Sequence, residues 1–265
     1  MSSRCLRAAV LFAIASATIA MAAPLRICAD PDNLPFSNRA GAGFDNRIAV
    51  LVAKELNREP VFVWARSRRG FLREQFNKGG CDVLMGVPQG MKKVLSTSPY
   101  YRSTYVFVTS RKDHLQIASF DDPQLNGRRI GLQILEQDYS PPSLPLIRNG
   151  HAKQLVGFDS FGDGGAQIVR AVAAGRVGTA VVWGPVAGYF ASALKLPVVL
   201  TPVSPAIDSS GIPFSFAITI GVHKQDAALC KQLNAALAQL RPKIDKLLAQ
   251  YSVPVTSGLA VKEAQ

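Results

Sequence analysis

Three short apolar runs between residues 25 and 86 decide the fold: Leu25-Arg26-Ile27-Cys28-Ala29, Val61-Phe62-Val63-Trp64 and Cys81-Asp82-Val83-Leu84-Met85-Gly86. Each run has the length and composition of a buried strand. Apolar residues at helical spacing occupy residues 45–56, and a second helix is expected from about residue 69 to residue 78, before Gly79-Gly80. Continuous apolar strands that alternate with helices predict a parallel sheet covered on both faces.

The rest of the chain repeats this alternation and predicts a second unit of the same kind. Further strands are expected at residues 105–110, 127–132, 179–183 and 214–222, and two C-terminal helices are expected on either side of Pro242. The strands near Phe107 and Phe216 are the natural crossings between the units. The sequence therefore predicts an α/β clamshell, in which residues 23–110 and 217–265 form lobe 1 and residues 111–216 form lobe 2.

The amino terminus predicts export. Arg4 and Arg7 precede an apolar run from Ala8 to Ala20, and Ala20-Met21-Ala22 places small residues at a cleavage site. This pattern is typical of a Sec signal peptide, here residues 1–22, cleaved after Ala22 to release a periplasmic protein. The alternative is an uncleaved anchor, but about 13 apolar residues are too few to span a bilayer comfortably. No later segment is apolar enough to predict a membrane span.

Basic residues dominate the charge. The formal net charge is +12, and the two arginines of the expected signal peptide account for two of these charges, which leaves +10. A charge of this size favours acidic partners, although a merely soluble basic surface is an equal alternative. No run of Lys or Arg exceeds two residues and no nucleic-acid motif is present, so nucleic acid is not an expected partner.

No set of residues predicts catalysis or metal binding. A Gly-x-Ser-x-Gly elbow is missing from the sequence, and His114, His151 and His223 lack metal-ligand spacing. The acidic pairs Asp30/Asp32 and Asp159/Asp163 are better explained as turn and helix-capping residues. We therefore expect no catalytic residue, metal or cofactor, and a protein that is not an enzyme.

Several stretches, in order, resemble the family-3 solute-binding proteins, which are the amino-acid receptors of ABC importers. They are Pro35-Phe36 with Gly43-Phe44-Asp45, Cys81-Asp82-Val83, Ser98-Pro99-Tyr100-Tyr101 and Ala173-Ala174-Gly175-Arg176. The resemblance implies a type II periplasmic binding protein fold, with two lobes that are each a mostly parallel sheet flanked by helices.

Two departures from that family concern its ligand. The receptors grip the ligand carboxylate with an Arg nine residues before the Pro-Tyr pair, where this chain has Gly90. They hold the ligand ammonium with an Asp at the position of Trp183. Glycine and tryptophan cannot replace a guanidinium clamp and a carboxylate. The chain is therefore not expected to bind free amino acids.

A more specific resemblance rests on longer blocks: residues 28–38, Arg69-Gly70-Phe71, Met85-Gly86-Val87-Pro88, residues 100–108 and residues 181–190. These blocks resemble the binding-protein-like "J" accessory proteins encoded beside PQQ-dependent methanol dehydrogenases. The resemblance implies a monomer that helps such a dehydrogenase mature or become active, with the cytochrome c of that dehydrogenase as a further candidate partner. The alternative is an importer receptor for a small ligand other than an amino acid. One departure is Gly178-Thr179, where the subfamily has an Asp.

The cleft between the lobes is the expected working surface, because ligands of open α/β sheets lie beyond the carboxyl ends of the strands. Aromatic and Arg residues are the usual anchors of protein interfaces. The candidates for partner binding are Asn33, Phe36, Asn38, Arg69, Pro88, Tyr101, Trp183 and Pro185.

Three cysteines follow the signal peptide, and the sequence alone leaves three pairings open. In the topology that the resemblance implies, the first and third strands are neighbours. We therefore predict a disulfide between Cys28 and Cys81, with Cys230 left free on a C-terminal helix.

Overall fold

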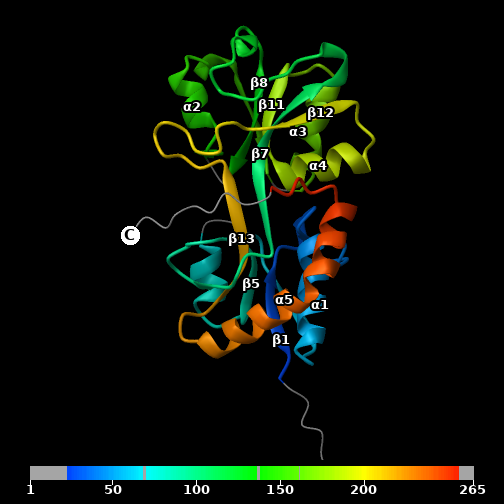
Figure 1. Ribbon diagram of the computed structural model, residues 1–265, viewed down its shortest axis with the longest axis vertical. Helices are drawn as coiled ribbons and strands as arrows, with labels where there is room; N and C mark the ends of the chain where they lie inside the picture. Colours follow the sequence, from blue (N-terminus) through cyan, green and yellow to red (C-terminus); the bar gives the residue numbers. More distant parts are fainter. Residues whose placement is uncertain (1–22, 68–69, 136–137, 161, 257–265) are drawn as a thin grey trace, which may run out of the picture.

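A computed structural model of the protein describes residues 23–67, 70–135, 138–160 and 162–256 (Figure 1). The expected signal peptide and Arg69 lie outside these residues. Among the helices that the structure describes, none is long and apolar enough to cross a membrane.

The lower half of the molecule in Figure 1, lobe 1, is built on β1 (Leu25–Ala29). This strand pairs in parallel with β4 (Pro60–Trp64) on one side and with β5 (Val83–Pro88) on the other. Strand β13 (Ser215–Val222) is antiparallel to β5, and β6 (Leu95–Ser96) is antiparallel to β13. A separate ribbon of β2 (Asp32–Asn33) and β3 (Ser37–Asn38) follows β1.

The upper half, lobe 2, repeats this strand order. Strand β8 (Ile130–Leu135) lies between β10 (Leu155–Asp159) and β11 (Thr179–Trp183), all parallel. Strand β7 (Tyr101–Ser110) is antiparallel to β11 and to β12 (Val198–Pro202), and the short β9 (Asp138–Tyr139) is antiparallel to the end of β8. The order β10-β8-β11-β7-β12 thus matches β4-β1-β5-β13-β6 in lobe 1.

Helices cover both faces of each half, as the apolar strands predict. Lobe 1 packs α1 (Phe44–Glu55) and α5 (Ala227–Gln250) on one face and the short π-helical turn η1 (Leu72–Phe76) on the other. In lobe 2, α3 (Gly164–Ala173) and α4 (Gly184–Ala193) cover one face, and α2 (Ser143–Arg148) covers the other. The remaining short turns are 3-10 helices: η2 (Arg111–Asp113), η3 (Pro123–Leu125) and η4 (Ala152–Gln154).

The halves are joined where β7 and β13 pair with each other. Their register runs from Tyr101 opposite Ile218 to Thr104 opposite Ser215, and we call this pairing the hinge. Phe216 lies within it, as predicted. Phe107 lies further along β7, where that strand already pairs with β11 and β12. Lobe 1 and lobe 2 are the two halves on either side of this hinge, and the division after residues 110 and 216 that the sequence predicts stays a proposal.

One prediction about helices was wrong. Residues 227–250 form one helix with Pro242 inside it, because Leu240, Ile244 and Leu248 continue the same buried face past the proline. The gain from that burial exceeds the cost of one missing backbone hydrogen bond. The helix expected from about residue 69 to residue 78 is present in a shorter form, as the π-helix η1, in which Asn77 N donates to Leu72 O.

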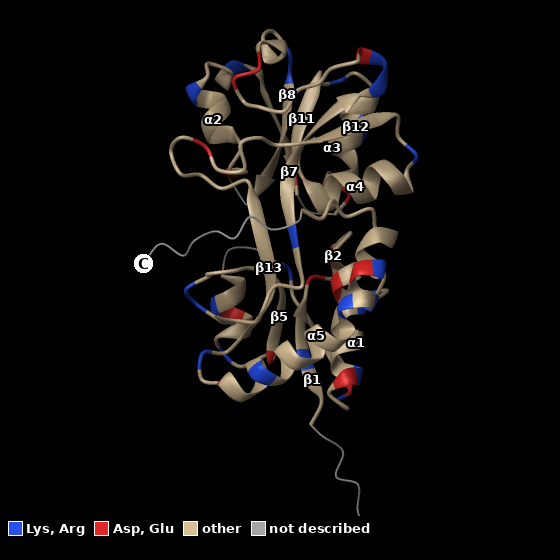
Figure 2. Cartoon of the chain, in the orientation of Figure 1, with Lys and Arg blue, Asp and Glu red and all other residues tan. Residues whose placement is uncertain are grey.

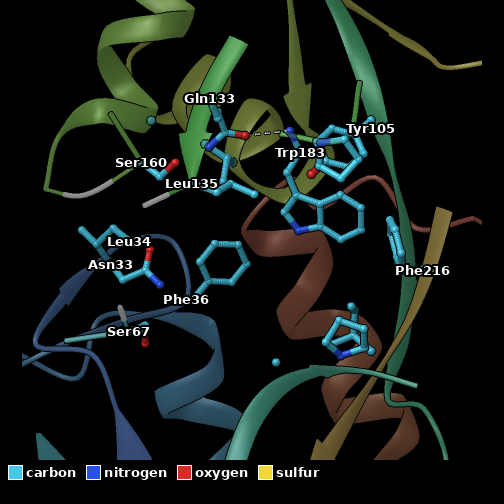
Figure 3. Close-up of a pocket in the computed structure, with 16 residues that line it drawn as sticks. Asn33, Leu34, Phe36, Ser67, Tyr105, Gln133, Leu135, Ser160, Trp183 and Phe216 are labelled. Carbon is cyan, nitrogen blue, oxygen red and sulfur yellow. Dashed lines mark hydrogen bonds between the residues drawn. The ribbon is translucent and has the colours of Figure 1, made fainter. Parts of the chain in front are cut away.

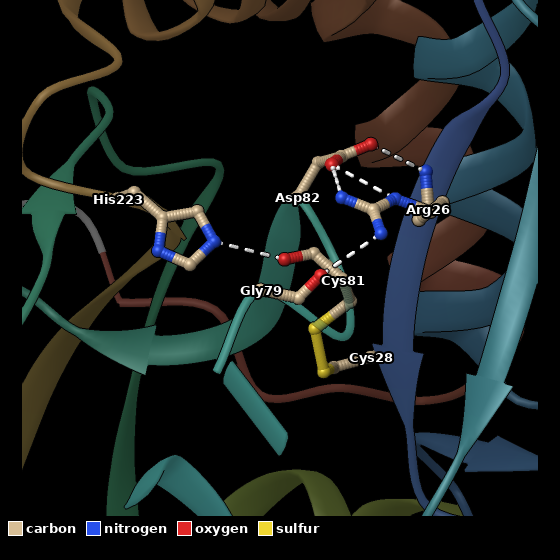
Figure 4. Close-up of a disulfide and its surroundings, with 6 residues drawn as sticks. All are labelled: Arg26, Cys28, Gly79, Cys81, Asp82 and His223. Carbon is tan, nitrogen blue, oxygen red and sulfur yellow. Dashed lines mark hydrogen bonds and ion pairs between the residues drawn. A yellow bond between two sulfur atoms is a disulfide. The ribbon is translucent and has the colours of Figure 1, made fainter. Parts of the chain in front are cut away.

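The predicted disulfide is confirmed. Cys28 and Cys81 are bonded, with Cα atoms 5.5 Å apart, because β1 and β5 are neighbours (Figure 4). Arg26 fixes the same corner: its guanidinium bonds Asp82 Oδ1 at 2.6 Å and the Gly79 carbonyl at 2.9 Å. Cys230 is a free, buried cysteine on α5, as predicted.

Residues 251–256 form a third connection between the halves, which we call the strap. The strap leaves the end of α5 and passes along α4 of lobe 2 (Figure 1). The Tyr251 hydroxyl donates to the Ala42 carbonyl in lobe 1, whereas the Tyr251 ring stacks on Tyr189 of α4, with centroids 5.6 Å apart. One side chain therefore contacts both lobes.

The strap also contacts the hinge directly. Ser103 Oγ donates to the Pro254 carbonyl at 2.6 Å, and Thr256 N donates to the Arg102 carbonyl at 3.1 Å. On the α4 side, a Cβ at Gly188 would lie 2.0 Å from the Ser252 carbonyl oxygen, so only glycine permits this approach.

Candidate binding cleft

A cavity of about 500 Å³ lies between the lobes, beyond the carboxyl ends of several strands (Figure 3). Its lining comes from both lobes and is mainly apolar or aromatic, with a few amides and hydroxyls. The described residues that line it are Asn33, Leu34, Phe36, Ser67, Gly86, Pro88, Tyr105, Gln133, Leu135, Pro141, Ser160, Gly165, Trp183, Val186, Phe216 and Ile218. None of these residues is charged.

Trp183 is the centre of the upper wall. It ends β11, and its ring meets those of Tyr105 and Phe216 edge to face, with centroids 5.3 and 5.8 Å apart. Its backbone nitrogen donates to Gln133 Oε1 at 3.0 Å (Figure 3). Gln133 is itself buried at 6 % exposure, so the amide fixes the end of β11 against β8. The indole is therefore held rigidly while one side remains open to the cavity.

Phe36 faces Trp183 from lobe 1, as Figure 3 shows. The first turn of α1 holds its loop, because Phe44 N donates to the Pro35 carbonyl (2.8 Å) and Asp45 N to the Phe36 carbonyl (2.9 Å). A Cβ at Gly43 would lie 2.0 Å from the Phe36 carbonyl oxygen, so this contact requires glycine. The ring packs edge to face on Phe44, with centroids 5.3 Å apart.

A smaller and more polar cavity of about 270 Å³ adjoins the first on the lobe 1 side, and Phe36 and Trp183 line both. Asp45 lies in its wall at 5 % exposure. Tyr100 Oη donates to Asp45 Oδ1 at 2.7 Å and accepts from Gly86 N at 3.0 Å. Burial raises the pKa of Asp45 to about 7, and the hydrogen bond from Tyr100 opposes this rise only in part.

The predicted candidates are only partly brought together. Asn33, Phe36, Pro88 and Trp183 line the main cavity, and Tyr101 lines only the smaller one, at 2 % exposure. Two others do not line either cavity. Asn38 braces its loop, because its Oδ1 accepts from Ala42 N at 2.8 Å, and Pro185 is buried in the first turn of α4. Arg69 lies outside the described residues.

Sequence reasoning did not name Ser67, Ser160 or Tyr105 as cleft residues, although all three line the main cavity. The sequence carried a signal for two of them, because Ser160 follows β10 directly and Ser67 follows β4 by three residues. The rule that ligands gather beyond strand ends would have found them. Tyr105 carries no such signal, because it lies within β7.

The lining of the main cavity is suited to bind an uncharged surface. Aromatic rings provide contact area, and Asn33, Gln133 and Ser160 provide directional hydrogen bonds. Gly90, where amino-acid receptors have their Arg, is exposed in a turn and does not line the cavity. Within the described ranges, no group of three or more His, Cys, Asp or Glu residues is arranged to hold a metal ion.

Two α/β lobes with matching strand order, a paired-strand hinge and a cleft between them define a binding protein of the periplasmic type. A model of the bacterial extracellular solute-binding proteins, family 3, matches residues 25–254, and the chain belongs to that family. The predicted fold, the type II periplasmic binding protein architecture, is confirmed.

Individual relatives share most of the chain. Protein MoxJ of Methylorubrum extorquens is 32 % identical over 251 residues, which is 88 % of this chain and 82 % of that protein. The crystal structure of MxaJ from Methlophaga aminisulfidivorans matches with a TM-score of 0.77 at 27 % identity, over 88 % of this chain and all of that one. The periplasmic binding protein XoxJ from Methylobacterium extorquens has a TM-score of 0.73 at 30 % identity and the same coverage.

Proposed function

We propose that the protein is a periplasmic accessory factor that binds a PQQ-dependent methanol or alcohol dehydrogenase and helps it mature or become active. The uncharged aromatic cavity between the lobes carries this proposal, because it offers rigid anchors for an apolar protein segment rather than handles for an amino acid. The similarity to MoxJ, MxaJ and XoxJ over most of the chain supports it. In this proposal the chain is exported by the signal peptide, is not an enzyme and acts as a monomer.

The test is a single truncation in the cleft. Trp183→Ala removes the largest ring of the upper wall and should weaken binding of the dehydrogenase by about 2 kcal/mol or more, which is the usual cost at an interface anchor. The measurement is co-purification and activation of a PQQ-dependent methanol dehydrogenase from the same periplasm.

Trp64→Ala is the matched control, because Trp64 is the other tryptophan of the chain and lines neither cavity of the cleft. Both variants should melt cooperatively. A well-folded Trp183→Ala protein that still activates the dehydrogenase fully would show that the cleft is not the working surface.

One observation favours a second candidate function. A cavity of about 500 Å³ is also the size of a small-molecule site. An importer receptor for a small uncharged ligand would hold that ligand tightly in the cleft without any dehydrogenase. If the purified protein retained such a ligand and did not bind the dehydrogenase, the function would be that of an importer receptor.

A further inference from the structure

A second concave surface lies on the outside of lobe 1, on the far side of Phe62 from the cleft. This groove, with a volume of about 430 Å³, runs between α1 and α5 and ends on the edge strand β4. The described residues that line it are Gly41, Asn46, Arg47, Val50, Leu51, Phe62, Lys243, Lys246, Leu247 and Gln250. Only Asn46 and Phe62 also line the smaller cavity of the cleft.

The groove has an apolar floor, because both helices turn apolar side chains toward it. Val50 and Leu51 of α1, Leu247 of α5 and Phe62 of β4 form this floor. Leu247 is 8 % exposed, while the other three are half-buried, so the floor keeps accessible apolar surface. Half-buried apolar side chains gathered in one concave surface are typical of a docking site.

The rim of the groove is cationic. Lys243 and Lys246 are three residues apart on α5, so they lie on one face of the helix, and both are exposed. Arg47 lies across the groove on α1, with its guanidinium 5.4 Å from the centre of the Tyr251 ring. Basic and acidic residues both occur along the last turns of α5 (Figure 2), but Asp245 is paired with Arg241 at 3.0 Å. No lining residue that the structure describes is acidic.

One polar group of the groove lacks a partner. Asn46 is 1 % exposed, and its Oδ1 accepts from Asn38 N at 2.9 Å, whereas its Nδ2 makes no hydrogen bond to any described residue. A buried donor without an acceptor is costly. Asn46 lines both the groove and the smaller cavity of the cleft, and the described lining of the groove supplies no carboxylate to neutralise its three cations.

We propose that this groove is a second docking surface, which takes an acidic segment of a protein partner with a large apolar side chain between its carboxylates. The apolar side chain packs on the floor while the carboxylates meet Arg47, Lys243 and Lys246. Like charge opposes docking of a second copy of this chain, whose formal net charge is +12 over the full sequence and +10 without residues 1–22. The identity of the partner as a dehydrogenase rests on the function proposed above, but the chemistry of the groove does not.

The test uses a labelled peptide in which glutamates flank a tryptophan-leucine pair, and the same peptide with lysines in place of the glutamates. Fluorescence anisotropy should show binding of the acidic peptide alone, weakening as salt is added. Lys243→Glu/Lys246→Glu should lower the affinity at least about tenfold. The matched control Lys224→Glu/Lys231→Glu changes the same charge at exposed lysines outside the groove and should change the affinity less than about twofold.

A second pair of variants separates charge from shape. Val50→Glu places a carboxylate at the floor and should abolish peptide binding, whereas Val50→Gln, of nearly the same size, should retain most of it. Equal binding of both peptides, or of both double variants, would overturn the proposal. So would binding of dodecanoate with no binding of the acidic peptide, which would make the groove a site for small anionic amphiphiles.

The same experiments distinguish a failure of the proposed function from a failure of the proposed groove. Trp183→Ala should bind the acidic peptide normally, because Trp183 is not part of the groove; loss of peptide binding in this variant would place the peptide in the cleft and contradict the inference. Peptide binding without capture of any quinoprotein dehydrogenase would leave the groove established and overturn only the dehydrogenase as partner.

Discussion

Asp45 couples the first turn of α1 to the wall of the cleft. Its carboxylate accepts from Tyr100, its backbone nitrogen donates to the loop that carries Phe36, and no cation pairs with it among the described residues. A buried carboxyl group without a cation is most stable when protonated, which is why its pKa rises to about 7. The residue therefore connects the stability of the cleft wall to pH.

The sign of this effect follows from linkage. The folded protein binds the Asp45 proton more tightly than the unfolded chain, so the stabilisation is complete below the unfolded pKa of 3.8 and is lost as the pH rises to about 7. Between pH 5 and pH 8 the wild type should lose about 3 kcal/mol of unfolding free energy relative to Asp45→Asn. Urea denaturation of both proteins across this range measures the difference. The control Asp163→Asn changes an exposed residue, and its unfolding free energy should change with pH as that of the wild type does. If the unfolding free energy of Asp45→Asn also followed the wild type across this range, Asp45 would not be the group responsible.

At the scale of elements, the disulfide closes the central strand pair of lobe 1. It joins β1 to the start of β5 across a sequence separation of 53 residues, and the Arg26 contacts surround it (Figure 4). The unfolded chain loses entropy when such a long loop is closed. The bond therefore stabilises the centre of the lobe 1 sheet, on which the loops of the cleft are built.

Removal of this bond should be costly. Cys28→Ala/Cys81→Ala should lower the unfolding free energy by roughly 4 kcal/mol, a value that loop closure predicts for this separation. Denaturant titration with and without a reductant measures the loss, because reduced wild type should approach the double variant. When it is produced without residues 1–22, the denatured, unreduced protein should show one reactive thiol, from Cys230. Three reactive thiols would mean that the bond does not form.

Some helices and strands could be predicted from the sequence and others could not, for physical reasons. Strands β1, β4 and β11 were found almost to the residue, because short apolar runs bounded by turn residues are a strong local signal for buried strands. Pro242 was wrongly predicted to separate two helices, since its local cost is visible in the sequence whereas the buried face that outweighs it depends on the packing of α5 against lobe 1. The cleft was located by topology, but Tyr105 and Phe216 became lining residues only through the way the hinge strands cross.

At the scale of the whole molecule, the cleft distinguishes this chain from amino-acid receptors of the same fold. Both positions that hold an amino acid in those receptors differ here, and the main cavity has no charged lining residue among those described. Calorimetry with the twenty common amino acids should therefore show no binding tighter than about 1 mM, or about −4 kcal/mol. Micromolar affinity for any of them would show that another part of the cleft supplies the missing charges.

The strap has a practical consequence for experiments on lobe movement. It ends at Thr256 beside the hinge, whereas β1 begins at the pole of lobe 1 that is furthest from lobe 2 (Figure 1). A fluorophore, tag or surface linker attached just behind Thr256 would lie against the paired strands that join the two lobes. Attachment ahead of Leu25 leaves the cleft, the hinge and the strap unhindered, so a sensor chip that holds the protein just ahead of Leu25 is the arrangement in which partner capture is least disturbed.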